Sequence, residues 1–487
     1  MKDYDYYLDK VGEIGFVDEI VHSIAYVSGL PKAHPDEVVI FETGEIGEVL
    51  SIDRERIEIL LLSRDPVKVG SKVARTNELF QVPVGESVLG RVVDPLVNPI
   101  DGGKPITKTH FVPIDTQPHG IVGRKHVEKP LETGVSLVDL AVPLAKGQRE
   151  LVIGDRKTGK TEFLLQTLLS QAGRGTICIY SVIGQRQIDI RKRYEFLVEK
   201  RIMEKCLIVA SSSSDPSGLI FLTPYTAMTI AESFRDKGFD VFLILDDLTT
   251  HARYYREISL LAKRFPGRSS YPGDIFYVHA RLIERAGNFK KGSITCLAVA
   301  ESILGDLSGY IQTNLMAMTD GHILFDIEYY NQGKRPAVNP SLSVTRVGHQ
   351  AQTPLQRSVS RELSSFLVKY EKMRQFLHFG AEAGETIKGV LELGAKIDLF
   401  FNQSPNTIIS INANIIIMAG LWAGIWNEVK GGDVKMEMEQ LILAYQTEDD
   451  FAKNIDSLIN ASEEFSSLVN SIRQNKSILT SKMTRSK

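Results

Sequence analysis

The sequence is poor in cysteine and has almost no excess charge, and both deficits limit what the protein can be. Its three cysteines, Cys178, Cys206 and Cys296, lie far apart in a chain of 487 residues, and two of them stand within apolar runs. We expect buried free thiols in a reducing compartment, with no disulfide framework and no zinc site. The formal net charge is −3, which gives no general electrostatic attraction to nucleic acid or to an anionic membrane.

The sequence also lacks a hydrophobic run long enough to span a membrane. The candidate stretch, Ile415 to Trp426, covers 12 residues, whereas a spanning helix needs about 20. We therefore expect a buried core helix there and no direct membrane insertion. The acidic start, Met1 to Asp5, is followed by no apolar segment of the kind found in secretory signals. We expect a cytoplasmic protein, with peripheral attachment to the inner face of the cell membrane left open.

Three regions differ in periodicity. Residues 1–82 contain short apolar or alternating runs separated by turn residues, a pattern typical of a small closed β-barrel. Residues 83–353 alternate strand-like and helical runs, which predicts an α/β domain with a largely parallel sheet. Residues 354–487 contain helical patterns only, which predicts a helical bundle. The expected strands include 38–41, 49–52, 57–62, 151–153, 177–182, 207–210, 241–245 and 294–299.

Helix signals mark the start of the third region and a polar stretch marks its end. Thr353-Pro354 is an N-cap followed by proline at the first helical position, and the helix is expected to end at Gly380. Further helices are expected at 386–399 and, with breaks, at 448–473. The last dozen residues, through Lys487, are expected to form a disordered basic tail.

A phosphate-binding loop is the most informative motif of the chain. It has the form G-x-x-x-x-G-K-[ST], stands between an apolar strand-like run and a helical run, and consists of Gly154, Asp155, Arg156, Lys157, Thr158, Gly159, Lys160 and Thr161. Backbone N–H groups and the helix N-terminus of such a loop bind phosphate oxygens. We expect the lysine to reach the β and γ phosphates and the hydroxyl of Thr161 to bind Mg²⁺. The chain is therefore expected to bind ATP or ADP with Mg²⁺.

A nucleotide site of this kind also needs a carboxylate at the end of a neighbouring strand. The run Val241 to Leu245 is followed by Asp246 and Asp247. We assign Asp246 to Mg²⁺, held through water.

Several motifs together resemble the F1 ATP synthase alpha subunit family, over nearly the whole chain after about residue 10. They are the phosphate loop, Gln148–Leu151, Gly90–Asp94, Pro266–Arg268, Tyr271–Asp274, His279–Arg285 and Ser343–Gly348. The resemblance implies an N-terminal β-barrel, a RecA-like phosphate-loop core and a C-terminal helical bundle. It also implies an alternating hexameric ring with catalytic beta-type subunits around a gamma-type central shaft.

Gln185 and Arg346 favour the alpha class over the catalytic beta class. By resemblance, Gln185 occupies the position of the beta-subunit glutamate that polarises the attacking water. A glutamine cannot accept a proton from water, so hydrolysis at this chain's own site should be very slow. The alternative is that Gln185 only caps its strand. Arg346, by resemblance, reaches the γ-phosphate on the adjacent beta subunit as an arginine finger; the alternative is a surface arginine in a salt bridge.

Other assignments follow from the resemblance and from departures from it. Arg335 and Pro336 are placed near the adenine. Phe400 and Asn402 stand where the family has two glutamines, which leaves base selectivity open. Lys157 replaces a glutamine, and its charge either tightens triphosphate binding or points to solvent.

The sequence says less about the partner subunits of the chain and about the cellular process that its ring would serve. Residues 1–10 are too short for the helical arm that docks the family's delta-type stator subunit, so that contact is doubtful. An F1-like ring serving another machine, such as motility, is one alternative. A stand-alone secretion-type ATPase would need a glutamate at position 185. A Rho-like RNA translocase would need a basic, aromatic-bearing N-terminal module, which residues 1–60 lack.

Overall fold

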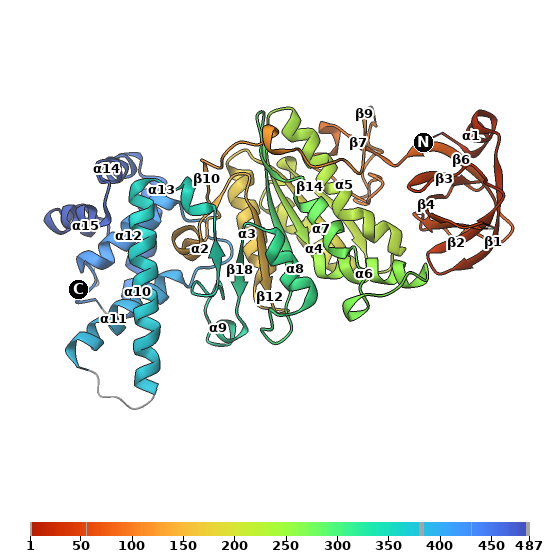
Figure 1. Cartoon of the computed structure of the whole chain (residues 1–487). Coiled ribbons are helices and arrows are strands. Elements are labelled where there is room, and N and C mark those ends of the chain that lie inside the picture. The colour runs from red at the N-terminus through yellow and green to blue at the C-terminus, as the bar shows by residue number, and fades with distance from the viewer. Residues whose placement is uncertain (1, 55, 109, 379–383, 430, 484–487) are drawn as a thin grey trace. The chain divides into compact units, whose positions relative to one another are not determined.

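A computed structural model describes residues 2–54, 56–108, 110–378, 384–429 and 431–483 (Figure 1). The chain forms two compact units that do not follow chain order. The first contains residues 1–125, 175–301 and 307–319, and the second contains 126–174, 302–306 and 320–487. The domain boundaries after residues 82 and 353 remain a prediction.

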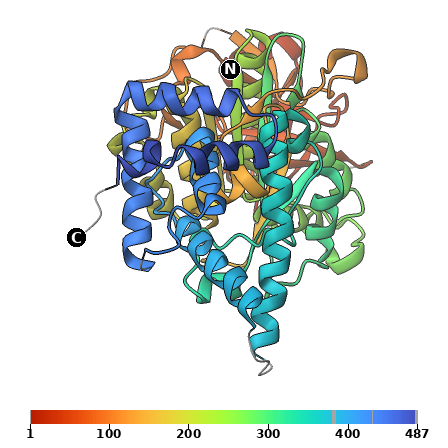
Figure 2. The same ribbon diagram turned by 90° about the vertical axis from the view of Figure 1, so that its left-hand side faces the viewer.

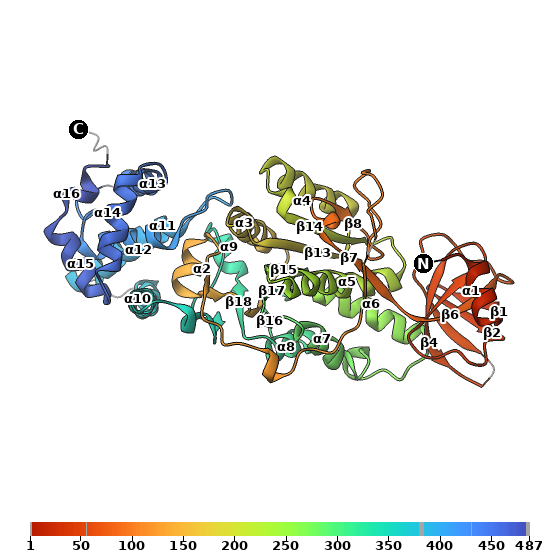
Figure 3. The ribbon, with the colours of Figure 1, turned by 90° about the horizontal axis from the view of Figure 1, so that it is seen from above.

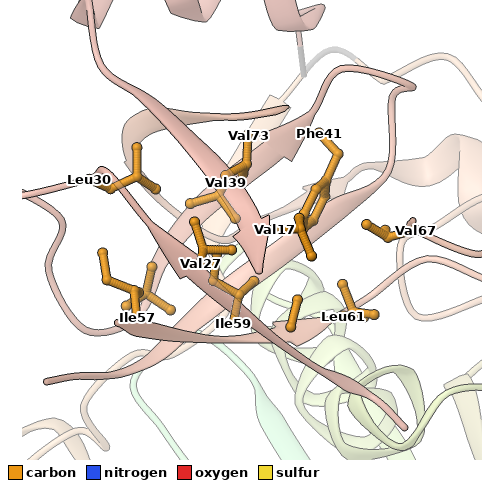
Figure 4. Packing of buried hydrophobic residues seen from close by; sticks show 12 residues of the cluster. Val17, Val27, Leu30, Val39, Phe41, Ile57, Ile59, Leu61, Val67 and Val73 are labelled. Carbon is orange, nitrogen blue, oxygen red and sulfur yellow. The ribbon is translucent and has the colours of Figure 1, made fainter. Parts of the chain in front are cut away.

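The N-terminal part of the first unit is a closed six-stranded barrel with strand order β1-β2-β5-β4-β3-β6, as predicted. Its strands are β1 (Ile14–Val21), β2 (Ile24–Ser28), β3 (Glu37–Phe41), β4 (Ile46–Ile52), β5 (Ile57–Leu61) and β6 (Lys72–Leu79). Inward-pointing valine, leucine, isoleucine and phenylalanine side chains fill the barrel (Figure 4). Closure leaves no exposed sheet edge, which explains how such short strands form a stable module.

A short helix, α1 (Tyr4–Val11), precedes the barrel and was not predicted. It lies against β6 (Figure 3), with Tyr7 buried beside Ile40 and Ala74. Asp3 caps the helix by accepting a hydrogen bond from the amide of Tyr6, and Gly12 ends it in the left-handed conformation. The sequence signal was an N-cap aspartate and a C-terminal glycine around only eight residues.

The rest of the first unit is built on a parallel sheet with the order β17-β15-β13-β14-β8. These strands are β17 (Ser293–Glu301), β15 (Asp240–Asp246), β13 (Ile177–Gln185), β14 (Cys206–Ser212) and β8 (Val92–Val93), and β16 (Gly287–Asn288) pairs antiparallel with β17. The four longer strands confirm the predicted apolar runs. They are buried almost throughout, as expected for a parallel sheet covered by helices on both faces.

The helices of this unit are α4 (Gln187–Glu199), α5 (Ser217–Asp236), α6 (Leu248–Leu261), α7 (Ile275–Ile283) and α8 (Tyr310–Met318). Short 3₁₀ turns lie at Glu86–Val88, Ile121–Gly123, Met203–Lys205 and Arg268–Ser270. A separate hairpin-like pair joins β7 (Gln81–Val84) and β9 (His110–Pro113). The helix α5 packs on β13, β14 and β15 and is itself mostly buried.

The second unit contains the strand and helix that flank the phosphate loop, β12 (Arg149–Gly154) and α3 (Lys160–Gly173). β12 pairs in parallel with β18 (Gly321–Phe325), and β18 pairs antiparallel with β19 (Val344–Thr345). The smaller elements are β10 (Pro130–Leu131), α2 (Ser136–Ala141), β11 (Leu144–Ala145), α9 (Ile327–Asn331) and the 3₁₀ turn Gly348–Ala351.

The C-terminal part of the second unit is helical, as predicted (Figure 2). Its helices are α10 (Pro354–His378), α11 (Glu385–Phe401), α12 (Ile411–Ala423), α13 (Gly431–Thr447), α14 (Asp449–Asn460), α15 (Phe465–Gln474) and α16 (Ser477–Thr480). α12 contacts α14 and α15 and is buried on nearly every side, which confirms the core helix expected at Ile415–Trp426. Gly380 lies outside the described residues.

The expected disordered tail is wrong as far as Met483. Residues Ser477–Thr480 form α16, and the side chains of Leu479 and Met483 are buried. The rest of this segment is mostly polar. Burial of the two apolar side chains removes them from water, and this favours an ordered segment over a disordered one. Residues 484–487 lie outside the described residues.

All three cysteines are buried free thiols, as predicted. Cys178 and Cys206 face each other in the register of β13 and β14, and Cys296 lies in β17. Within the described ranges, no helix combines the length and apolar character that a membrane crossing requires.

Candidate functional site

The phosphate loop lies between β12 and α3, where the sequence predicted it. Gly154 is required at the end of β12, because a Cβ atom there would lie 2.3 Å from the carbonyl oxygen of Phe325. Gly159 has a φ of 95° and Lys157 a φ of 62°, so the loop turns twice through the left-handed region. Residues in this conformation allow successive N–H groups to converge on one point, as a phosphate site needs.

Two side chains, those of Lys160 and Thr158, fix the shape of the loop. Nζ of Lys160 donates to the carbonyl oxygens of Gly154 at 2.6 Å and Asp155 at 2.7 Å. The hydroxyl of Thr158 donates to the carbonyl oxygen of Asp155 at 2.8 Å. The ammonium group of Lys160 and the half-buried hydroxyl of Thr161 thus lie at the start of α3, where phosphate and a metal would meet them.

The carboxylate of Asp155 anchors a second segment to the loop. Its Oδ1 accepts 2.6 Å and 3.1 Å hydrogen bonds from the hydroxyl of Ser302 and the amide of Gly305. The amide of Ser302 donates to the carbonyl oxygen of Gly154. Asp155 was predicted to contact nucleotide. In the structure its carboxylate instead holds the segment that contains Ser302 and Gly305. Sequence reasoning missed Ser302 and Gly305, which are about 150 residues away and carry no motif signal.

In the first unit, Gln185 and Asp246 lie at the ends of the adjacent parallel strands β13 and β15. Nε2 of Gln185 donates to the backbone oxygen of Asp246 at 3.1 Å. Oε1 of Gln185 accepts a 2.7 Å hydrogen bond from Nη2 of Arg193. Both polar atoms of the Gln185 amide are therefore hydrogen-bonded within the protein. These two hydrogen bonds hold the side chain in one orientation.

Asp246 is part of the same buried cluster. Its Oδ2 accepts hydrogen bonds from Nη2 of Arg193 at 3.0 Å and from the hydroxyl of Tyr180 at 2.9 Å. Burial raises the pKa of Tyr180 far above its usual range, so the phenol is a donor at neutral pH. The contacts found among the described residues use Oδ2 and leave Oδ1 of Asp246 for water. Arg193 and Tyr180 were not predicted as site residues.

Asp247 has a structural role at the start of α6. Its carboxylate caps the helix by accepting from the amide of Thr250 at 2.5 Å and from its hydroxyl at 3.1 Å. Burial, with a smaller effect of the neighbouring charge of Asp246, raises the pKa of Asp247 to about 7. The choice of Asp246 over Asp247 as the metal-facing carboxylate is consistent with this cap.

The described residues contain no group of three or more histidine, cysteine, aspartate or glutamate side chains able to bind a metal. A Mg²⁺ ion would need phosphate oxygens and water as its main ligands, which is the usual arrangement for this ion. The hydroxyl of Thr161, beside the phosphate loop, is an oxygen ligand that fits that chemistry.

Arg346 is exposed and follows β19 in the second unit. Its amide donates to the carbonyl oxygen of Asp320 at 3.2 Å, and the side chain forms no ion pair within the part of the chain that the structure describes. The preceding residue, Thr345, is held firmly: its hydroxyl donates to the carbonyl oxygen of Pro143 at 2.9 Å and accepts from the amide of Gly348 at 3.2 Å. The guanidinium stands on a fixed base and near the buried Glu150, where burial raises the pKa of the carboxyl and the charge of Arg346 acts in the opposite direction.

Comparison with known proteins assigns the chain to a family. Residues 134–345 match the family model of the ATP synthase alpha/beta family, nucleotide-binding domain, and residues 352–475 match that of the ATP synthase alpha/beta chain, C terminal domain. A protein named ATP synthase subunit alpha from Dictyoglomus thermophilum is 40% identical over 421 residues, covering 85% of this chain and 82% of the relative. The chain belongs to the ATP synthase alpha subunit family.

Further relatives with that name support the assignment. The protein from Neorickettsia sennetsu is 37% identical over 459 residues, 92% of this chain and 90% of its own length. The protein from Staphylococcus aureus is 37% identical over 437 residues, 89% of this chain and 87% of its own length. The alignments extend beyond the nucleotide-binding core, and the closed barrel and helical C-terminal region agree with the fold expected of an ATP synthase alpha subunit.

A cavity in the second unit is lined by the two residues that the sequence analysis placed near the adenine. Arg335, Pro336 and Asn402 line one cavity of about 440 Å³ in the second unit, together with Tyr370 and Asp398. Arg335 stacks on Tyr330 at 3.7 Å, and its Nη1 donates to the backbone oxygens of Tyr330 and Lys334. This geometry brings Arg335-Pro336 together with Asn402.

Phe400 does not line that cavity. Its side chain is buried, packs against Phe401 and lines a separate cavity of about 250 Å³. The next polar residue, Gln403, is buried and donates from Nε2 to the carbonyl oxygens of Gly134 and Thr407, while its Oε1 accepts from the amide of Ser136. Gln403 therefore ties α11 to the segment before the phosphate loop, a role that the sequence pattern did not indicate.

Proposed function

We propose that this chain is the non-catalytic, nucleotide-binding alpha-type subunit of an F1 or F1-like rotary ATPase ring. The observation that carries the proposal is the amide of Gln185 at the end of β13, held by Arg193 and the backbone of Asp246. An amide has no basic oxygen able to take a proton from an attacking water, and this one is already hydrogen-bonded at both ends. Binding without turnover is the expected result.

The bound ligand is ATP or ADP with Mg²⁺. The phosphate loop from Gly154 to Thr161 supplies backbone N–H groups, with the ammonium of Lys160 for the β and γ phosphates. Thr161 would contact the metal directly and Asp246 through water, and the metal would supply charge neutralisation between phosphates. The base would lie near Arg335 and Pro336. A site that binds without splitting its ligand stabilises the folded subunit through the binding free energy.

The catalytic contribution of the chain is Arg346, acting on a nucleotide bound by an adjacent beta-type subunit. Its exposure, its lack of an ion pair among the described residues and the fixed position of Thr345 support this role. A guanidinium at the γ-phosphate stabilises charge that builds in the transition state and contributes about 10³–10⁵ in rate.

The relatives named ATP synthase subunit alpha support partners of the same type for this chain. We propose catalytic beta-type subunits alternating with it in a hexameric ring, and a gamma-type shaft in the centre. Proton-coupled synthesis and service to another machine, such as motility, would use the same ring.

The test of this function is Arg346→Ala in the assembled ring. Turnover should fall by about 10³ or more, while the ring forms normally by size-exclusion chromatography. Arg357→Ala, which removes an exposed arginine at the start of α10, is the matched control and should leave turnover intact. Near-normal ATPase activity of the Arg346→Ala ring would refute the finger.

A further inference from the structure

A buried glutamate, Glu150, lies on β12, in the same sheet as the strand β19 that Arg346 follows. In the strand register, Glu150 pairs with Gly321 of β18, and Gly321 pairs with Thr345 of β19. Residues paired in this way point to the same face of a sheet. Because the middle residue of the row is a glycine, no side chain separates Glu150 from Thr345, which directly precedes Arg346.

The Glu150 carboxyl occupies the space beside Gly321. A Cβ atom at position 321 would lie 2.8 Å from Oε1 and 2.9 Å from Oε2 of Glu150. The glutamate is 0% exposed, and its Oε1 has no hydrogen-bond partner among the described residues. A buried polar atom without a partner costs stability. A carboxyl at this position is therefore better explained by function than by packing.

Gln148 connects the Glu150 carboxyl to the base of Arg346. Its Nε2 donates to Oε2 of Glu150 at 2.7 Å and to Oγ1 of Thr345 at 3.3 Å. Its Oε1 accepts a 2.9 Å hydrogen bond from the amide of Ala145, which fixes the orientation of the side-chain amide. Because Glu150 accepts the shorter of the two donated hydrogen bonds, it holds Gln148 where Gln148 reaches Thr345.

The charge state of the Glu150 carboxyl suits this role. Burial raises the pKa of Glu150 well above its usual range, against the lowering effect of the hydrogen bond from Gln148. The charge of Asp320 adds to the rise, and the charge of Arg346 opposes it. The carboxyl therefore keeps its proton at a pH where an ordinary glutamate is ionised. A neutral carboxyl still accepts from Gln148, and it attracts the guanidinium of Arg346 less than an anion would.

We propose that Glu150 is a positioning residue for the arginine finger, acting through Gln148 and Thr345 on the direction in which Arg346 leaves β19. The inference rests on the proposed function, because it requires that Arg346 acts on a nucleotide bound by the adjacent subunit. It goes further by naming a buried residue on which the finger depends. That residue lies on the strand that leads into the phosphate loop.

The test measures kcat and KM for ATP, per assembled ring, in rings that contain Glu150→Gln or Glu150→Leu. Glu150→Gln keeps an uncharged side chain with an acceptor oxygen for Gln148, so kcat should stay within about threefold. Glu150→Leu removes the acceptor and should lower kcat by about tenfold or more with KM nearly unchanged, because a finger acts in the transition state. Glu463→Leu, at an exposed position before α15, is the matched control and should change neither constant.

Two further variants separate positioning from a structural defect. In an Arg346→Ala background, Glu150→Leu should lower kcat no further, because Glu150 acts only through the arginine. Gln148→Met breaks the same connection from its other end and should lower kcat by about tenfold or more. This variant covers the case in which Glu150→Leu does not fold.

Three results would overturn the inference while the proposed function stands. They are a wild-type kcat in Glu150→Leu or Gln148→Met rings, an equal loss in Glu150→Gln and Glu150→Leu rings, and a full additional loss from Glu150→Leu in the Arg346→Ala background. Near-normal turnover by the Arg346→Ala ring would overturn the inference and the proposed finger together.

Discussion

Oε1 of Gln185 lies 2.7 Å from Nη2 of Arg193, so the amide at the end of β13 is hydrogen-bonded to a buried cation. This hydrogen bond affects whether a glutamate at position 185 could act as a base in hydrolysis. A carboxylate introduced at position 185 would meet the guanidinium directly, which lowers its pKa and weakens it as a base.

We therefore predict that Gln185→Glu alone does not make the isolated chain an ATPase. Phosphate release by the purified variant should remain at the background of the wild-type chain. Gln187→Glu, which adds the same charge at an exposed neighbouring position, is the matched control. Turnover by Gln185→Glu at about 1 s⁻¹ or faster, within the ordinary range of enzymes, would show that Arg193 does not restrain the residue.

Substitution of Lys160 should weaken ATP binding much more than substitution of Lys157, although both lysines lie in the phosphate loop. Lys160 is half-buried at the start of α3, whereas Lys157 is exposed. Lys160→Gln should weaken ATP binding by about tenfold to a hundredfold, because a hydrogen bond to a charged group contributes about 1.5–3 kcal/mol. Lys157→Gln should change affinity by less than about threefold. Equal losses in a binding titration would favour the other alternative, in which the charge of Lys157 tightens triphosphate binding.

Thr345 should control the finger without touching nucleotide. Valine would remove the hydroxyl that donates to Pro143 and accepts from Gly348 and Gln148. The resulting shift of the segment before Arg346 should lower ring turnover by about tenfold or more, since small misplacements of catalytic groups are costly. Thr313→Val, at an exposed position on α8, is the control. Unchanged turnover in Thr345→Val, with the variant incorporated into rings, would show that this anchor is dispensable.

Asp139 should make stability decrease as pH rises. Burial raises the pKa of this carboxyl from 3.8 to about 7, against the lowering effect of hydrogen bonds from Thr133. The folded chain thus holds a proton that the unfolded chain has released, and the associated stability is complete below about pH 4 and lost as pH rises through about 7.

Asp139→Asn should remove the pH-dependent part of the stability that the Asp139 carboxyl contributes. The thermal midpoint of the wild-type chain should fall between pH 5 and pH 8 by more than that of the variant. Asp450→Asn, at an exposed position in α14, should behave like wild type. Parallel pH profiles for wild type and Asp139→Asn would mean that the folded and unfolded carboxyl groups titrate alike.

Much of the architecture could be predicted because its signals are local. Buried parallel strands are continuous apolar runs, and the phosphate loop has a motif whose glycines are needed for stated backbone reasons. An N-cap residue followed by proline marks the start of the helix at Pro354. The apolar stretch of α12 is too short to span a membrane, which favours a core helix. By contrast, α1 and α16 are short, and each depends on a few buried side chains such as Tyr7 and Leu479.

The interior of the candidate site was harder to predict. Arg193 reads in the sequence as one of three solvent-facing basic residues, and its partner Asp246 lies 53 positions away. Gln403 and Ser302 likewise depend on contacts made only after the chain folds. Burial of a charged or amide side chain among distant partners leaves no periodic trace in a single sequence, so the structure was needed to find these residues.

The central claim is that this chain binds a triphosphate and does not split it. The most direct measurement loads the purified chain, free of any partner, with γ-labelled ATP and follows bound and released phosphate over time. We expect stably bound, intact ATP and no turnover above background. Continuous phosphate release at about 1 s⁻¹ or faster, lost in Lys160→Gln, would contradict it.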